Sequence, residues 1–277
     1  MPKRLTESQV EQYRRDGFAS PVAVLDAAEV AALRADLEAW EARQGHPLDF
    51  PEKSKSYLLY KWADALVHHP AVLDAVEDLI GPDILVYHST MWIKEAHTPA
   101  YVRWHQDGAY FFLDPLDHVT AWVALSDASE RAGCMRVLPG THRLPMIAHD
   151  DKPGRYNMIK RGQGISDRFD GETGVAMPLK AGELSLHHTA LVHCSPGNDG
   201  DDRRMGYGIS FIPAHVRPTG PLAPSALLVR GVDRHRHFLP ETRLGTPMSP
   251  DAQAAHAEAV RLFRLLQDKG FSATPAA

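Results

Sequence analysis

The chain has 277 residues, of which 44% are hydrophobic, so it can bury a substantial core as one large domain or two small ones. This composition excludes a disordered chain, and a formal net charge of -5 gives no positive surplus that would attract nucleic acid or an anionic membrane. We therefore expect a small molecule as the partner.

The cysteines and the apolar segments indicate the compartment. Only Cys134 and Cys194 are present, too few for a disulfide framework or a cysteine-based zinc site, which favours a reducing setting. No apolar run approaches the roughly 20 residues that span a bilayer, and the first residues do not resemble a signal peptide. We predict a soluble cytoplasmic protein that is a monomer or a homodimer.

The first 82 or so residues are predicted to be helical. Residues 6–9 (TESQ) form a capping-box pattern ahead of a short opening helix. The pattern returns at residues 26–29, before apolar residues at helical spacing, and Gly45 marks the expected end of that second helix. A third helix is expected from His69-Pro70 to Gly81, because proline is favoured in a first helical turn.

From residue 83 the pattern changes to short β-branched and aromatic runs bounded by turn residues. Several strands in a row without intervening helices predict an antiparallel sandwich or double-sheet barrel, with a core over about residues 83–216. Residues 149–174 are polar and are expected to form a long loop over the barrel mouth. A last helix is expected over residues 250–269, and we expect a single domain over residues 1–277. The strand-like runs are ILVYHSTMWI, HVTAWVALSD, CMRVLPGTH, GELSLHHTALVH and RRMGYGISFIP.

The stretch WHQDGAYF, residues 104–111, contains a candidate metal site. In an extended strand, residues two apart point to the same face, roughly 6.6 Å from each other, so His105 and Asp107 could converge on one ion. His193, at the end of another strand-like run, is the candidate third ligand. Two imidazoles and one carboxylate are typical of non-haem Fe(II) oxygenases, whereas zinc more usually takes four ligands. These residue types alone leave a zinc hydrolase or a sugar-binding cupin open.

Arg204 and Ser195 favour one alternative. Arg204 lies eleven residues after His193 on the next predicted strand. An arginine fork binds a carboxylate through two hydrogen bonds and stays charged when buried, which suits the far carboxylate of a dicarboxylic co-substrate. Strand alternation allows only one of Arg203 and Arg204 to face inward, and we expect Arg204. The metal triad with a buried arginine indicates 2-oxoglutarate.

Over about residues 57–213 the sequence resembles the phytanoyl-CoA dioxygenase family of Fe(II)- and 2-oxoglutarate-dependent oxygenases, particularly its bacterial small-molecule hydroxylases. The resemblance rests on WHQDGAYF, on TAWVALSDASERAGCMRVLPGTH, on the SLHH block that ends at His193 and Ser195, and on R-x-G at residues 204–206. It implies a mainly β protein with flanking helices around a double-stranded β-helix, or jelly-roll, core. The family uses Fe(II), 2-oxoglutarate and O2, oxidises an unactivated C–H bond of a small molecule, and releases succinate and CO2. The resemblance implies His105, Asp107 and His193 as iron ligands and Arg204, Ser195, Trp122 and Lys55 as co-substrate residues.

Asp107 also bears on the type of oxidation. In halogenating relatives a small residue replaces this carboxylate and opens an iron position for chloride, so the intact Asp107 favours hydroxylation or a related oxidation. His187 and His188 are expected to be structural, and the Arg/His cluster at residues 230–237 to be solvated.

Two other functions remain open. A cupin-like isomerase or hydrolase would use the same triad without 2-oxoglutarate and should tolerate Arg204→Ala. A non-catalytic binding protein of this fold would be expected to have lost a ligand or the arginine, and neither has been lost.

Overall fold

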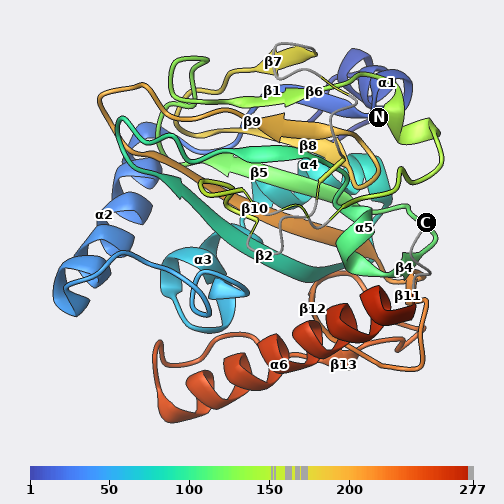
Figure 1. Cartoon of the computed structure of the whole chain (residues 1–277). Helices are drawn as coiled ribbons and strands as arrows, with labels where there is room; N and C mark the ends of the chain where they lie inside the picture. The colour runs from blue at the N-terminus through green and yellow to red at the C-terminus, as the bar shows by residue number, and fades with distance from the viewer. Residues whose placement is uncertain (151, 153, 160–163, 166–168, 170–173, 274–277) are drawn as a thin grey trace.

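The computed structural model describes residues 1–150, 152, 154–159, 164, 165, 169 and 174–273, with side chains up to residue 268. Figure 1 shows β-sheets at the centre of the molecule with helices around them. The mainly β architecture with flanking helices that the sequence predicts is confirmed.

Two sheets make up the jelly-roll core. The large sheet has seven strands in the order β1-β8-β5-β10-β2-β12-β13, and the small sheet has four in the order β3-β9-β6-β7. All neighbouring strands are antiparallel except β12 and β13. A further pair joins β4 (Leu113–Asp114) to β11 (Arg217–Pro218). The strands of the large sheet are β1 (Phe18–Ala23), β2 (Ile84–Lys94), β5 (Val119–Ala124), β8 (Glu183–His188), β10 (Arg204–Pro213), β12 (Ser225–Arg230) and β13 (Leu239–Pro240), and those of the small sheet are β3 (Val102–His105), β6 (Met135–Val137), β7 (Val175–Met177) and β9 (His193–Ser195).

The predicted helices are confirmed, and their ends follow from local chemistry. The Thr6 and Asp26 side chains accept hydrogen bonds from backbone N–H groups of the first turns, and the capping box is complete at both sites. Gly17 and Gly45 end these helices in the left-handed conformation. None of the described helices is long and apolar enough to cross a membrane. The helices are α1 (Glu7–Asp16), α2 (Ala27–Gln44), α3 (Lys61–Val67), α4 (Pro70–Ile80), α5 (Gly108–Phe111) and α6 (Pro250–Ala273), with short 3-10 turns at Ser56–Leu58 and Thr141–Arg143.

The two faces of the large sheet differ in polarity because side chains alternate along each strand. In β10, Met205, Tyr207, Ile209 and Phe211 belong to the main apolar core, which α3 and α4 also join. The residues that alternate with them include Arg204, just before Met205, and Ser210, and these face the interior between the two sheets, where they line cavities. The sheet therefore rests on helices with one face and carries polar groups into the barrel with the other.

The structure differs from the sequence prediction at both ends of the β core. The N-terminal part is not entirely helical, because β1 forms an edge strand of the large sheet beside β8. Strand β12 pairs with β2, so the core continues past residue 216. The signal for β1 is weak because Pro21 interrupts the strand, and its register with β8 shifts between Ala19 and Val22.

Candidate metal centre and the two adjoining cavities

Three predicted side chains meet at one point between the sheets. The candidate ligand atoms of His105, Asp107 and His193 all lie within 4.8 Å of one another. Nε2 of His105 is 3.4 Å from Oδ1 of Asp107, and Nε2 of His193 is 3.7 Å from the same oxygen. Strands β3 and β9 bring the histidines together, since His105 and His193 are directly opposed in the antiparallel register. Such a group can hold one metal ion.

The local geometry at Asp107 differs from the predicted strand. Strand β3 ends at His105, and Asp107 has helical dihedral angles (φ -56°, ψ -37°) at the start of α5. The chain turns here because the N–H of Gly108 donates a hydrogen bond to the carbonyl of Thr189. The two ligands therefore converge through a strand-to-helix turn, and their closeness does not come from alternation along a strand.

The backbone fixes both imidazole rings in the orientation that a metal requires. Nδ1 of His105 donates to the carbonyl of Arg103 at 2.8 Å, and Nδ1 of His193 donates to that of Leu191 at 3.0 Å. Because a carbonyl oxygen can only accept, each Nδ1 carries the proton and each Nε2 presents its lone pair to the centre. Metal-binding histidines almost always have this second hydrogen bond.

The carboxylate of Asp107 is held through its other oxygen. Oδ2 accepts a hydrogen bond from Oγ1 of Thr120 at 2.9 Å, and Nε2 of His187 lies 3.4 Å away. Burial acts to raise the pKa of Asp107, but the positive charge that His193, His105 and His187 carry when protonated outweighs it and holds the pKa well below its usual range. Burial lowers the pKa of His193 well below its ordinary value. The centre therefore presents a carboxylate and a neutral imidazole, the protonation states that bind metal ions.

An inner cavity of about 60 Å³ lies between the two sheets on one side of this centre, and Arg204 faces into it. The Arg204 side chain is buried, and Nη1 donates to the carbonyl of Gly133 at 3.2 Å. Its Nε finds no hydrogen-bond partner among the described residues, and the guanidinium lies over the ring of Trp122 at 5.0 Å. Burial lowers the pKa of Arg204 to about 10. Arg204 is thus a buried cation at neutral pH with unfilled donors.

Glycine at position 206 explains how Trp122 fits beside Arg204. A Cβ atom added at Gly206 would overlap the six-membered ring of Trp122. The indole therefore lies directly on the backbone of β10, where the Arg204 guanidinium stacks on it. In the R-x-G motif, Arg204 therefore supplies the buried positive charge, and Gly206 leaves the space that the Trp122 ring occupies.

Ser195 also lines the inner cavity, and its hydroxyl is held by Lys94, a residue that the sequence analysis missed. Nζ of Lys94 is fully buried and donates to Oγ of Ser195 at 2.7 Å, to its carbonyl at 3.2 Å, and to the carbonyl of Pro196. Burial, together with the charge of Arg204, lowers the pKa of Lys94 to about 6. Lys94 is directly opposite Arg204 in the β2–β10 register, so a strand alignment could have found it.

The structure does not bring Lys55 to this cavity. Nζ of Lys55 is buried elsewhere, 2.6 Å from Oε1 of Glu241 and 3.1 Å from the carbonyl of Ser225. Lys55 is therefore tied to the C-terminal part of the chain, and the expectation that it lines the co-substrate site is corrected. The position of Lys55 in the sequence could not show this. A buried lysine needs a partner, and the carboxylate that pairs with Lys55 lies 186 residues further along the chain.

Other predicted features are placed as follows. Arg203 points away from the cavities and pairs with Glu41 at 2.6 Å and Glu95 at 2.7 Å. Residues 230–237 line neither cavity. Much of the predicted loop at residues 149–174 lies outside the described residues, but Ile159 lines the outer cavity described next.

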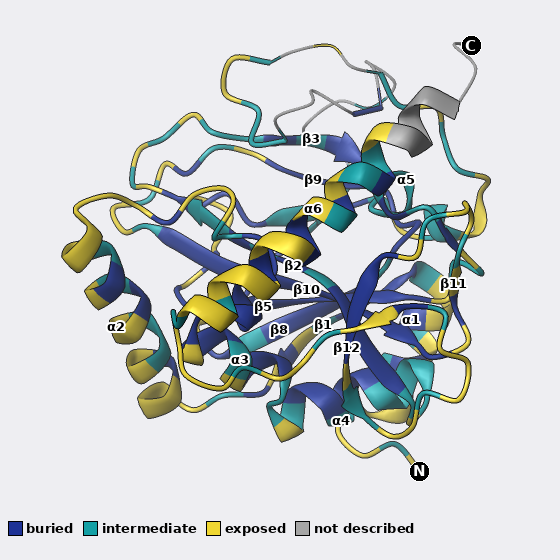
Figure 2. Cartoon of the chain, turned by 90° about the horizontal axis from the view of Figure 1, so that it is seen from below, coloured by how far each residue is buried: buried dark blue, intermediate teal, exposed yellow. Residues whose placement is uncertain are grey.

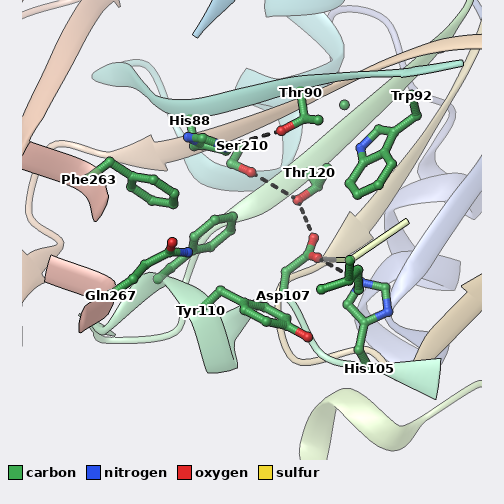
Figure 3. Close-up of a pocket in the computed structure, with 13 residues that line it drawn as sticks. His88, Thr90, Trp92, His105, Asp107, Tyr110, Thr120, Ser210, Phe263 and Gln267 are labelled. Carbon is green, nitrogen blue, oxygen red and sulfur yellow. Dashed lines mark hydrogen bonds and ion pairs between the residues drawn. The ribbon is translucent and has the colours of Figure 1, made fainter. Parts of the chain in front are cut away.

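The outer cavity, of about 170 Å³, also adjoins the metal centre and shares His105 and Asp107 with the inner cavity. His105 and Asp107 lie at one end of it, and Phe263 and Gln267 of α6 lie at the other (Figure 3). Its remaining walls come from β2, β5, β10, α5 and Ile159. The lining residues are His88, Thr90, Trp92, His105, Asp107, Tyr110, Phe111, Thr120, Ile159, Gly208, Ser210, Phe263 and Gln267.

Known proteins that are similar to this chain include enzymes named as hydroxylases and oxygenases. One similar relative is the L-proline trans-4-hydroxylase of Streptomyces griseoviridis, 25% identical, with 79% of this chain and 91% of the relative covered. Another is a probable alpha-ketoglutarate-dependent hypophosphite dioxygenase of Stutzerimonas stutzeri, 24% identical, with 76% and 79% covered. Among solved structures, the non-heme monooxygenase ThoJ in its apo form is 33% identical, with a TM-score of 0.85 and coverage of 96% of this chain and 100% of that one.

The sequence profile of the phytanoyl-CoA dioxygenase (PhyH) family matches residues 13–206, well over half of the chain. The matched region contains the three converging side chains, Trp122, Ser195 and Arg204. The chain therefore belongs to the phytanoyl-CoA dioxygenase family of iron- and 2-oxoglutarate-dependent oxygenases.

Proposed function

We propose that the protein is an Fe(II)- and 2-oxoglutarate-dependent dioxygenase that oxidises an unactivated C–H bond of a small molecule and releases succinate and CO2. In this proposal His105, Asp107 and His193 are the iron ligands. Arg204, Ser195 and Trp122 hold the co-substrate in the inner cavity, and the substrate enters the outer cavity.

Arg204 carries the choice of co-substrate. Its guanidinium is buried between the sheets with an unfilled Nε, and no carboxylate of the described residues pairs with it. A buried charge without a partner is costly, so a site that keeps one is built for an anion that arrives with a ligand. The same cavity includes all three candidate metal ligands, so a dianion with an adjacent keto and carboxylate group can reach the metal and Arg204 together.

The residues around the centre have separate tasks. The bound iron supplies the oxidative chemistry, as the cofactor does in such enzymes. The two imidazoles and Oδ1 of Asp107 would hold the iron, and His105 and Asp107 line both cavities, so a co-substrate in one and a substrate in the other would both adjoin it. Trp122 and Met135 line the inner cavity with apolar surface and exclude water from the co-substrate. Ser195, held by Lys94, offers its hydroxyl as a hydrogen-bonding group to the same cavity.

We further propose hydroxylation or a related oxidation in preference to chlorination. The support is the intact Asp107, the carboxylate that a small residue replaces in the halogenating relatives. Incubation of active enzyme with its substrate in chloride buffer, followed by mass spectrometry, should give products without chlorine.

The first test of the proposed function needs no substrate. Anaerobic protein is titrated with Fe(II) and then with 2-oxoglutarate while the weak visible metal-to-ligand charge-transfer band is followed. We expect the band in the wild type and in His188→Ala, a control because His188 lines neither cavity, and no band in His105→Ala. Metal binding without a band in the wild type would contradict the proposal and favour a cupin-like isomerase or hydrolase.

A further inference from the structure

The outer cavity is completed by a helix that lies outside the matched family region. The family profile ends at residue 206, whereas α6 begins at Pro250. Phe263 and Gln267 are one helical turn apart on α6, and both face the cavity that also contains His105 and Asp107 (Figure 3). The family region thus supplies the metal centre, and this chain's C-terminal helix supplies the opposite wall.

Helix α6 is firmly seated against the barrel. Figure 2 shows buried residues along one side of it and exposed residues along the other. Nε2 of His256 lies 2.8 Å from the carbonyl oxygen of Ser54, and Phe263 and Leu266 are buried in one apolar cluster. The ring of Phe263 stacks on that of His88 with centroids 4.1 Å apart and planes at 15°. This wall is therefore preformed, as expected of a ligand site.

The lining of the outer cavity is aromatic at its sides and uncharged away from the metal. Among the described residues that line it, Asp107 is the only acid, and no lysine or arginine is present. The aromatic members are Trp92, Tyr110, Phe111 and Phe263. An anionic group placed here would lose its hydration without gaining a positive partner from the described lining residues, and it would lie near the Asp107 carboxylate.

Hydrogen-bonding groups occupy the end away from the metal. Nε2 of His88 lies 3.1 Å from Oγ1 of Thr90, and Nδ1 of His88 is buried without a partner among the described residues. Burial lowers the pKa of His88 to about 3, with a smaller effect from the charge of Lys55, so the ring is neutral. Ser210 and Gln267 add a hydroxyl and an amide. Each of these groups can bind an uncharged oxygen or nitrogen.

We propose that α6 determines substrate specificity through Phe263 and Gln267, and that the part of the substrate that enters the outer cavity is a largely apolar unit without negative charge. This inference rests on the proposed function, since it takes the outer cavity as the substrate site. It assigns α6 a role that the matched family region, which ends at residue 206, does not supply.

A pair of one-ring probes tests the charge preference. Protein loaded anaerobically with Fe(II) and 2-oxoglutarate is titrated with benzyl alcohol and with benzoate, and binding is followed by ligand-observed NMR and by changes in the charge-transfer band. We expect benzyl alcohol to bind and benzoate to bind at least ten-fold more weakly. Equal or tighter binding of benzoate, or no binding of benzyl alcohol up to its solubility limit, would overturn the inference.

Variants of α6 test the location. Phe263→Trp and Gln267→Trp should fill the cavity and reduce benzyl alcohol binding at least ten-fold while the charge-transfer band remains. Gln267 is partly exposed, so its variant tests the inference even if Phe263→Trp fails to fold. Leu266→Val is the matched control, because Leu266 is buried on the same helix but does not line the cavity.

The outcomes separate the two proposals. If the band never forms in the wild type, the proposed function fails. If the band forms but both tryptophan variants bind benzyl alcohol like the wild type, the proposed function stands and the role of α6 is wrong.

Discussion

Oγ1 of Thr120 donates a hydrogen bond of 2.9 Å to Oδ2 of Asp107 and so connects the carboxylate of this proposed metal ligand to the central strands of the large sheet. Thr120 is directly opposite Ser210 on one neighbouring strand and His187 on the other. His187 lies 3.4 Å from the same carboxylate oxygen. Because Oδ2 is held in this way, Oδ1 is left to face the metal position (Figure 3).

We therefore predict that Thr120→Val weakens metal binding by roughly ten-fold, since removal of a group that orients a ligand commonly costs that much. Calorimetric titration with Co(II), with no co-substrate present, measures this. Thr120→Ser should restore most of the affinity because it keeps the hydroxyl. Thr90→Val should leave it unchanged, because Thr90 bonds His88 and not Asp107. Wild-type affinity in Thr120→Val would show that the bond does not position the carboxylate.

Gly206→Ala should displace the Trp122 indole, because the added methyl group would overlap its ring. We expect a loss of about 1–3 kcal/mol in the free energy of unfolding and weaker 2-oxoglutarate binding. Gly208→Ala is the control, since the nearest atom to its added methyl group is Nε1 of Trp92 at 3.3 Å. Denaturant unfolding and tryptophan fluorescence would detect the change, and equal effects of the two substitutions would contradict the packing argument.

Lys94 predicts a dependence of stability on pH. Burial lowers the pKa of Lys94 to about 6, below its value of 10.5 when exposed. Between these values the unfolded chain binds a proton that the folded chain does not, so the Lys94 contribution to the free energy of unfolding rises with pH. Below about pH 6 the buried group is charged in both states and its burial penalty is fully present. Lys94→Met should therefore flatten the rise seen in the wild type between pH 6 and 9, and an unchanged slope would contradict this assignment.

Lys55 and Glu241 form a buried ion pair with side-chain exposures of 1% and 5%. We predict that Lys55→Met lowers the free energy of unfolding by about 3 kcal/mol, because it leaves a buried carboxylate without its cation. Lys55→Met with Glu241→Gln should recover part of this loss. The 2-oxoglutarate affinity of folded Lys55→Met should match the wild type, and a large decrease would return Lys55 to the co-substrate site.

The convergence of the three candidate metal ligands could be predicted from sequence to the level of the residues. His105 and Asp107 are two apart, and His193 and Arg204 follow in the family's order, so short motifs contain nearly all the information. The backbone conformation was not predictable, because Asp107 lies beyond the end of the strand, in a turn where the N–H of Gly108 bonds to the carbonyl of Thr189, which is distant in sequence. Alternation within a strand is a local rule, and this turn depends on tertiary contacts.

The surroundings of the centre were harder to predict for the same reason. Thr120, His187 and Lys94 reach the site through strand register, which the sequence does not state. Phe263 is an ordinary apolar residue of an amphipathic helix until the packing of α6 places it in the outer cavity. Sequence patterns thus predicted the helices and most strands, while long-range packing determined the cavity walls.

The central claim is that Arg204 is the receptor for the co-substrate carboxylate. Anaerobic calorimetric titration of 2-oxoglutarate into Fe(II)-loaded wild type, Arg204→Met and Arg203→Met tests it most directly, because the two arginines are adjacent and only Arg204 faces the inner cavity. We predict that Arg204→Met weakens binding by about a hundred-fold, equivalent to about 2.7 kcal/mol, and that Arg203→Met binds like the wild type. Unchanged affinity in Arg204→Met, with the fold and metal binding intact, would contradict the account.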